Sequence, residues 1–258
     1  MRFSKWHALG NAYLLVERAE LEQPLTGDQA RALCDYHTGV GSDGVLEILA
    51  VHGPEAEVLV WNPDGSTAEL SGNGARIAAR WLALRAGVAH VRLRIGDRLM
   101  RARVDGSQVE IDLGEVEVGW PETIDVEGEQ IEFTPVSVGN PHAVVRRDGD
   151  RNELLRLGPL IEHHPRFPQR TNVQLVRSLG PRELGVLVWE RGAGETLSSG
   201  SSSTAAAAAA ITQGWCENPA LVHLPGGTLE VELRANRALL TGPALEIFRA
   251  ELSRDTGV

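Results

Sequence analysis

Residues 71–86 read SGNGARIAARWLALRA, and residues 199–213 read SGSSSTAAAAAAITQ; a Ser-Gly pair opens both stretches, 128 positions apart. We predict one helix over about residues 73–86 and another over about 201–213, because alanine has the highest helix propensity and serine is a preferred residue at helix starts. The six alanines at 205–210 carry minimal side chains, so neighbouring backbone can approach this helix closely. The second helix is therefore expected at the centre of a domain.

Two further matches at nearly the same spacing indicate a duplicated domain. Residues 58–61 (VLVW) recur at 186–189, and Gly10-Asn11 recurs as Gly139-Asn140. The offset of 128 or 129 positions is half of the 258-residue chain. Coincidence between valine-rich strands explains these matches less well than duplication.

Short β-rich runs, punctuated by Gly and Pro, accompany the strong helix in each half. No long linker separates the halves, and the boundary is expected near residues 114–121. The predicted strands cover residues 56–61, 88–95, 109–113, 184–189 and 229–233, and the predicted outer helices cover residues 29–37 and 152–157.

Composition excludes several functional classes. The net charge is −10, which disfavours a protein that tracks nucleic-acid phosphates. Charged residues interrupt every apolar stretch before it could span a membrane, and residues 1–7 lack the apolar core of a secretory signal, so a cytoplasmic protein is expected. Cys34 and Cys216 lack metal-ligand spacing, and no metal site is expected. Lys5 is the single lysine, which nearly excludes a pyridoxal-phosphate Schiff base.

The two helix starts have the chemistry of an anion site. Residues 69–76 and 195–202 open the two helices, and a helix N-terminus presents unpaired N–H groups with a partial positive charge. Gly72 and Gly200 would let a ligand approach the backbone. If the starts face each other across a pseudo-two-fold axis, Ser71 and Ser199 lie on opposite sides of the ligand. Both serines could also be N-caps only.

The polar residues around these starts suit a small zwitterion. Arg191 can hold a carboxylate with two hydrogen bonds, and Glu190 can hold an ammonium group. His142 could act as an acid, a base or an orienting group. Four asparagines in expected turns could reach the same site, although each alone is more often a turn former: Asn11, Asn62, Asn140 and Asn172.

On these residues the sequence resembles the diaminopimelate epimerase family along its whole length. The specific motifs are Glu-Arg-Gly-Ala-Gly-Glu-Thr at 190–196 and Gly-Asn-Gly-Ala-Arg at 72–76, after Asp-Gly-Ser at 64–66. Further matches lie at 5–11, 41–44, 139–142 and 241–244.

The resemblance implies an α/β (α+β) fold with two pseudo-symmetric duplicated domains, each a β-barrel-like sheet around a central helix. We expect residues 1–114 to form the first domain, joined by 248–258, and residues 115–247 the second. The family also implies a homodimer that needs no cofactor and acts on a small amino acid, LL- or meso-2,6-diaminopimelate, in an interdomain cleft.

The family mechanism implies roles for the candidate residues. Two bases transfer the α-proton on opposite faces of the substrate, from the positions of Ser71 and Ser199. Backbone at Gly72-Asn73 and Gly200-Ser201 would hold the reacting carboxylate, while His142 and Glu190 would tune the bases and bind the amine. Asn11 belongs to the same candidate site. The distal carboxylate would meet Asn62, Asn140, Asn172 and Arg191.

The sequence departs from the family at the two bases, because serine stands where the family has cysteine. A serine hydroxyl is a far weaker acid than a thiol and needs an adjacent base. Residues 201–203 are also Ser-Ser-Ser, where the family usually reads Thr-Gly-Ala. Three explanations stay open: a natural serine branch that still epimerises, an engineered cysteine-to-serine variant, and a lost or altered activity, namely an amino-acid-binding protein, a lyase or a racemase of another amino acid.

Overall fold

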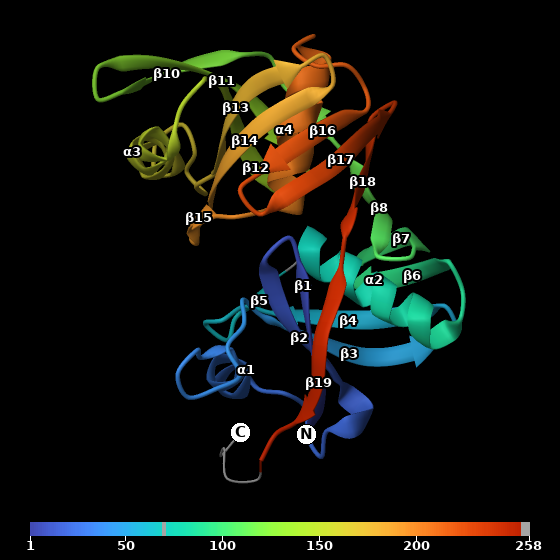
Figure 1. The fold of residues 1–258 in the computed structure, drawn as a ribbon. Coiled ribbons are helices and arrows are strands. Elements are labelled where there is room, and N and C mark those ends of the chain that lie inside the picture. The colour runs from blue at the N-terminus through green and yellow to red at the C-terminus, as the bar shows by residue number, and fades with distance from the viewer. Residues whose placement is uncertain (69–70, 254–258) are drawn as a thin grey trace. The chain divides into compact units, whose positions relative to one another are not determined.

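The computed structural model describes residues 1–68 and 71–253 and divides the chain into two compact units (Figure 1). Unit 1 is Met1–Ile111 together with the chain from Gly242 onward, and unit 2 is Asp112–Thr241. The chain passes between the units inside β8 (Gln108–Glu115) and β18 (Arg237–Pro243). Glu69 and Leu70 of the first expected helix start, and residues 254–258 of the expected C-terminal return, lie outside the described residues.

Unit 1 is a sheet of mostly antiparallel strands with two parallel pairings. The last strand, β19, pairs with β1, and β1 pairs with β2, both antiparallel. The parallel pairs are β2 with β3 and β4 with β6. Besides β8, the strands are β1 (Arg2–Ala8), β2 (Asn11–Glu17), β3 (Val45–His52), β4 (Glu55–Trp61), β5 (Thr67–Ala68), β6 (His90–Ile95), β7 (Arg98–Asp105) and β19 (Leu245–Glu251).

Unit 2 repeats this order of pairings. Strand β11 is antiparallel to β12, and the parallel pairs are β12 with β13 and β14 with β16. Besides β18, the strands are β9 (Glu117–Val118), β10 (Glu122–Val126), β11 (Glu129–Ser137), β12 (Pro141–Arg146), β13 (Asn172–Gly180), β14 (Glu183–Glu190), β15 (Gly194–Thr196), β16 (Ala220–Leu224) and β17 (Gly227–Arg234).

The strand register confirms the duplication that the sequence predicts. Val45 pairs with Trp61 in unit 1, and Val173 pairs with Trp189 in unit 2, so both pairs match at an offset of 128. The parallel pairings β2–β3 and β12–β13 match as well. Two duplicated halves of mixed α/β structure, dominated by sheet, are the fold class that the sequence analysis expected.

Each sheet packs around one central helix. In unit 1, α2 (Gly72–Ala86) contacts β1, β2, β4, β6 and β7. In unit 2, α4 (Gly200–Thr212) contacts strands from β9 to β17. The residues of α4 from Ser202 to Ala210 are buried on every side. Alanine and small hydroxyl side chains make this possible, because a helix with bulkier residues would need more room inside the sheet.

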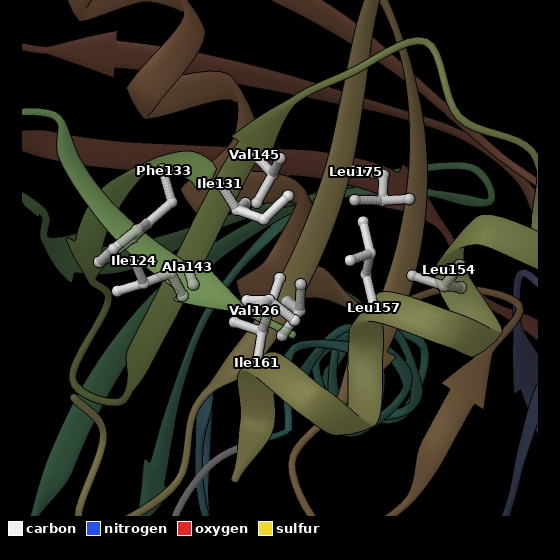
Figure 2. Packing of buried hydrophobic residues seen from close by; sticks show 11 residues of the cluster. Ile124, Val126, Ile131, Phe133, Ala143, Val145, Leu154, Leu157, Ile161 and Leu175 are labelled. Carbon is white, nitrogen blue, oxygen red and sulfur yellow. The ribbon is translucent and has the colours of Figure 1, made fainter. Parts of the chain in front are cut away.

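A second helix covers the outer face of each sheet. In unit 2, α3 (Arg151–Glu162) packs Leu154, Leu157 and Ile161 against the strands (Figure 2). In unit 1, α1 (Gly27–Cys34) contributes Ala30 and Leu33 to a cluster with β1, β2 and β3. Short helices with one apolar face gain most of their stability from such packing. The other helix of the described part of the chain is the 3₁₀ turn Arg18–Glu20.

The elements differ from the expected bounds mainly at helix ends. The helix predicted over residues 29–37 ends at Cys34, because the Asp35 carboxylate accepts N–H groups of His37 and Thr38 at 2.8 and 2.6 Å and forms a turn. The helix predicted over 152–157 continues to Glu162, through Pro159. The units change over at residues 111/112 and 241/242, a few residues before the expected boundaries at 114/115 and 247/248.

Candidate active site

The candidate site of unit 1 lies at the start of α2. Ser71 is the N-cap, and its Oγ accepts the N–H of Gly74 over 3.0 Å. The phenol oxygen of Tyr13, from β2, lies 2.9 Å from the same Oγ. A side chain at position 74 would be crowded, because its Cβ would lie 2.9 Å from Leu46 and 3.2 Å from Ser71 Oγ. The bonds to Gly74 and Tyr13 hold the Ser71 hydroxyl at the start of α2.

Asn73 connects the first turn of α2 to the start of β2. Its Nδ2 donates to Asn11 Oδ1 over 3.1 Å, and its Oδ1 accepts from Arg76 over 2.7 Å. Arg76 is fully buried, and it also donates to the carbonyl of Gly72. Burial lowers the pKa of Arg76 to about 10, which still leaves the guanidinium charged at neutral pH. This buried charge adds to the positive field at the helix start.

The candidate site of unit 2 lies at the start of α4. Ser199 is the N-cap, and its Oγ accepts the N–H of Ser202 over 3.4 Å. The Ser199 hydroxyl lies near the carboxyl of Glu190, at the end of β14, and favours its ionised form. Burial raises the pKa of Glu190 above its usual value, and the Ser199 hydroxyl only partly offsets this effect. A carboxyl with a raised pKa beside a hydroxyl is suited to accepting and returning a proton.

His142 lies on β12 in the same unit and is 1% exposed. One ring nitrogen, Nδ1, accepts from the Gln174 amide over 3.1 Å, so the other, Nε2, carries the proton and donates to Asn140 over 2.9 Å. Burial, reinforced by the charge of Arg191, lowers the pKa of His142 to about 3. The ring is therefore neutral at physiological pH, with both nitrogens occupied.

Gln174 links this histidine to the helix start. Its Nε2 also donates to Ser202 Oγ over 3.1 Å, and Ser202 in turn bonds through its N–H to Ser199. His142 thus reaches Ser199 through two intervening residues, whereas the Glu190 carboxyl lies near the Ser199 hydroxyl. Of the two residues expected to tune the bases, Glu190 is the one near Ser199, and His142 has the geometry of a positioning group.

Asn172 holds the turn that carries Arg191. Its Nδ2 donates to the Pro141 carbonyl over 2.9 Å, and its Oδ1 accepts the backbone N–H of Arg191 over 3.0 Å. The exposed side chain of Arg191 makes one long contact, 3.4 Å, with the carbonyl of Gln169. Among the described residues, Arg191 forms no ion pair. Its guanidinium is therefore available to a carboxylate from outside the chain.

A buried carboxylate also bonds to the turn that carries Arg191. Glu162, 3% exposed on α3, accepts the indole N–H of Trp189 over 2.7 Å and the N–H of Gly192 over 2.9 Å. Unit 1 has a corresponding pair, in which Trp61 donates to the buried Glu47 over 3.0 Å. These tryptophans are the last residues of the repeated VLVW segment.

The remaining candidates lie at the expected turns and helix starts. Asn62 follows β4 and donates to Ser66 Oγ over 3.0 Å. Gly72 and Gly200 are buried, Ser201 is partly buried, and all three belong to the first turns, whose N–H groups have no partner within a helix. Within residues 1–68 and 71–253, the His, Cys, Asp and Glu side chains form no group of three or more that could hold a metal ion.

Sequence reasoning missed Tyr13, Gln174 and Ser202. The repeat offers a signal for the first, because an offset of 129 maps Tyr13 onto His142. At an offset of 128, Gln174 and Ser202 map onto Leu46 and Gly74, so unit 2 has a polar contact where unit 1 has an apolar one. A comparison of the two halves position by position would have indicated these residues.

A family model and two relatives match this chain over nearly its whole length. A family model described as diaminopimelate epimerase matches residues 3–119 and 134–246. The diaminopimelate epimerase of Pseudomonas syringae pv. syringae is 36% identical, covering 98% of this chain and 99% of the relative. That of Synechocystis is 40% identical, covering 97% of this chain and 98% of the relative.

A solved structure shows the same fold. A hydroxyproline epimerase from Agrobacterium vitis, with bound trans-4-hydroxy-L-proline, superposes with a TM-score of 0.73 at 15% identity, over 98% of this chain and 90% of the other. The family model and the relatives together define an isomerase of the epimerase class. The chain belongs to the diaminopimelate epimerase family. None of the helices among the described residues is long and apolar enough to cross a membrane.

Proposed function

We propose that this chain is a cofactor-independent epimerase that interconverts LL- and meso-2,6-diaminopimelate, in the synthesis of lysine and peptidoglycan. Its family and the names of its relatives support this substrate. The proposal extends to a cytoplasmic homodimer, in which the substrate lies between the two halves of the chain. Ser71 and Ser199 would then face opposite sides of the α-carbon.

The observation that carries the proposal is the proximity of Ser199 to Glu190. The Ser199 hydroxyl accepts the N–H of Ser202 and lies near the Glu190 carboxyl, whose ionised form it favours. When Ser199 takes the α-proton from carbon, its own proton can pass to Glu190, so no free alkoxide needs to form. The raised pKa of Glu190 makes this carboxylate a stronger base than an exposed glutamate. Serine can therefore replace cysteine in the proton transfer.

Substrate binding uses charge and backbone. The first-turn N–H groups of α2 and α4 would accept the α-carboxylate and stabilise negative charge that develops at the α-carbon. Arg191, whose backbone Asn172 holds, would pair with the distal carboxylate. A substrate without a second carboxylate would leave this arginine without its partner, which favours a diacid.

Exchange of the α-hydrogen with deuterium oxide, followed by NMR, tests the proposal. LL- and meso-diaminopimelate would be incubated with the unchanged protein, with Ser71→Ala/Ser199→Ala, and with Ser71→Cys/Ser199→Cys. We expect exchange with inversion in the unchanged protein, loss of exchange in the alanine variant, and faster exchange in the cysteine variant, because a thiol titrates at about pH 8.5.

The other outcomes identify the alternatives. Binding of diaminopimelate without exchange in the unchanged protein, with exchange in the cysteine variant, would show a binding protein on an epimerase scaffold. Exchange of a monocarboxylic amino acid in preference to diaminopimelate would show a racemase of another amino acid. Absence of exchange in both the unchanged protein and the cysteine variant would overturn the assignment of diaminopimelate as the substrate. Sedimentation of the unchanged protein as a monomer would overturn the homodimer.

A further inference from the structure

Ser71 has a titratable neighbour that is not equivalent to Glu190. The side chain of Tyr13 is 7% exposed, and its phenol oxygen lies 2.9 Å from Ser71 Oγ. The N–H of Gly74 donates to the same Oγ over 3.0 Å. The Ser71 oxygen is thus held between a helix N–H and a phenol, whereas the Ser199 oxygen accepts a helix N–H and lies near a carboxyl.

The two halves differ in which strand supplies this neighbour. Tyr13 matches His142 in the repeat, but the ring nitrogens of His142 bond to Asn140 and Gln174. Neither bond reaches Ser199. The second strand of the repeat therefore supplies a direct partner to the serine in unit 1 and an indirect one in unit 2.

At the ends of β4 and β14, in contrast, it is unit 2 that supplies a titratable neighbour to its serine. Glu190 lies near Ser199, whereas the matching residue in unit 1 is Asn62, whose amide donates to Ser66. An asparagine amide does not titrate, so it cannot take a proton from Ser71. Within residues 1–68 and 71–253, Ser71 has Tyr13 as its titratable neighbour and Ser199 has Glu190, and the two neighbours come from non-equivalent positions.

We propose that Tyr13 is the residue that exchanges a proton with Ser71 during epimerisation, an inference that rests on the proposed function. It acts through Ser71 and does not need to touch the substrate. Free phenols have a pKa of about 10, whereas aliphatic hydroxyls are far weaker acids. A phenolate is therefore a much more accessible proton acceptor than a serine alkoxide.

The proton transfers balance across the two faces. For the stereoisomer whose α-hydrogen faces Ser71, the C–H bond breaks, its proton joins Ser71 Oγ, and the Ser71 hydroxyl proton passes to the Tyr13 phenolate. On the other face, the Ser199 hydroxyl proton joins the carbon, and Glu190 returns its carboxylic proton to Ser199. The reverse reaction starts with Tyr13 protonated and Glu190 ionised, so one proton is shared between the two partners.

Tyr13→Phe tests this role, because it removes the hydroxyl and keeps the ring in place. In deuterium oxide, we expect inversion to fall by about 100-fold or more, as loss of a general acid–base group does. Exchange without inversion should persist for only one stereoisomer, the one whose α-hydrogen faces Ser199. The ratio of exchange between isomers is measured within one sample, so it does not depend on how much of the variant is folded.

A second comparison separates proton transfer from support of the helix start. A cysteine at position 71 needs no phenol to ionise, so Tyr13→Phe in a Ser71→Cys background should cost only a small part of the activity that it costs beside serine. Tyr36 is the chain's other tyrosine, and its hydroxyl donates to Asp43 over 3.0 Å at an exposed position. Tyr36→Phe is the matched control and should leave the exchange of both isomers unchanged.

The outcomes separate this inference from the proposed function. Equal loss of exchange for both isomers in Tyr13→Phe, or the same loss beside cysteine as beside serine, would overturn the role of Tyr13 and leave the epimerase activity standing. Absence of exchange in the unchanged protein would overturn the proposed function, and the role of Tyr13 with it. We expect Tyr13→Phe to lose exchange for one isomer only, and we expect Ser71→Cys to restore most of that exchange.

Discussion

His142 is buried and neutral, so the free energy of unfolding of the protein should decrease in mild acid. Protonation of the folded protein would place a charge where Gln174 already donates to Nδ1 and where Asn140 occupies Nε2. The pKa of His142 is about 3 in the folded state, against 6.5 for an unperturbed histidine. His142→Gln removes the titrating ring and keeps one acceptor and one donor.

The size of the effect follows from these two pKa values. Between pH 6.5 and 3 the unfolded chain binds a proton at this position and the folded chain does not, so the free energy of unfolding decreases as pH falls. The limiting slope is about 1.4 kcal/mol per pH unit, and the accumulated loss between pH 7 and pH 5 is about 2 kcal/mol. The raised pKa of Glu190 acts in the opposite direction, because the folded state then keeps that proton to higher pH.

Urea unfolding at pH 7, 6 and 5 measures the effect, with the unchanged protein and His142→Gln side by side. The difference between the two curves isolates the histidine, since Glu190 is present in both. We expect the variant to lose about 2 kcal/mol less than the unchanged protein between pH 7 and pH 5. His52→Gln, at an exposed position, should follow the unchanged protein. Parallel curves for His142→Gln and the unchanged protein would refute the assignment of a buried neutral ring.

Three substitutions in unit 2 test its packing and its buried hydrogen bonds. In Gly158→Ala, a Cβ would lie 2.6 Å from Cγ of Trp189, so we expect a loss of about 1–3 kcal/mol of unfolding free energy in urea. Gly180→Ala, with no atom nearer than 3.8 Å, should stay within about 0.5 kcal/mol; equal effects would contradict the close contact. Glu162→Gln leaves one of the N–H groups of Trp189 and Gly192 without an acceptor and should cost about 1–3 kcal/mol; unchanged urea unfolding would contradict this account.

The sequence alone predicted the parts of the fold that depend on local chemistry. The starts of α2 and α4 follow from Ser71 and Ser199, because an N-cap serine bonds within its own first turn. The duplication follows from the VLVW repeat, whose tryptophans take the same place in the strand register of each unit.

The contacts that depend on strand register could not be predicted in this way. Tyr13 meets Ser71 from 58 positions earlier in the chain, and Glu162 meets Trp189 from a helix on the outer face of the sheet. Neither pair has a local sequence signal. For His142 the sequence left acid, base and orienting roles open, and only the occupied ring nitrogens distinguish among them.

The pairing of β19 with β1 has a consequence for how the chain folds as it leaves the ribosome. All strands of unit 2 lie within one continuous segment, so that unit can complete its sheet during synthesis. Unit 1 needs Leu245–Glu251, which follows the whole of unit 2 in the sequence, to cover the edge of β1. An uncovered strand edge is open to pairing with other chains. The nascent protein therefore exposes β1 until Leu245–Glu251 has been synthesised, and this interval is when chaperone protection would matter most.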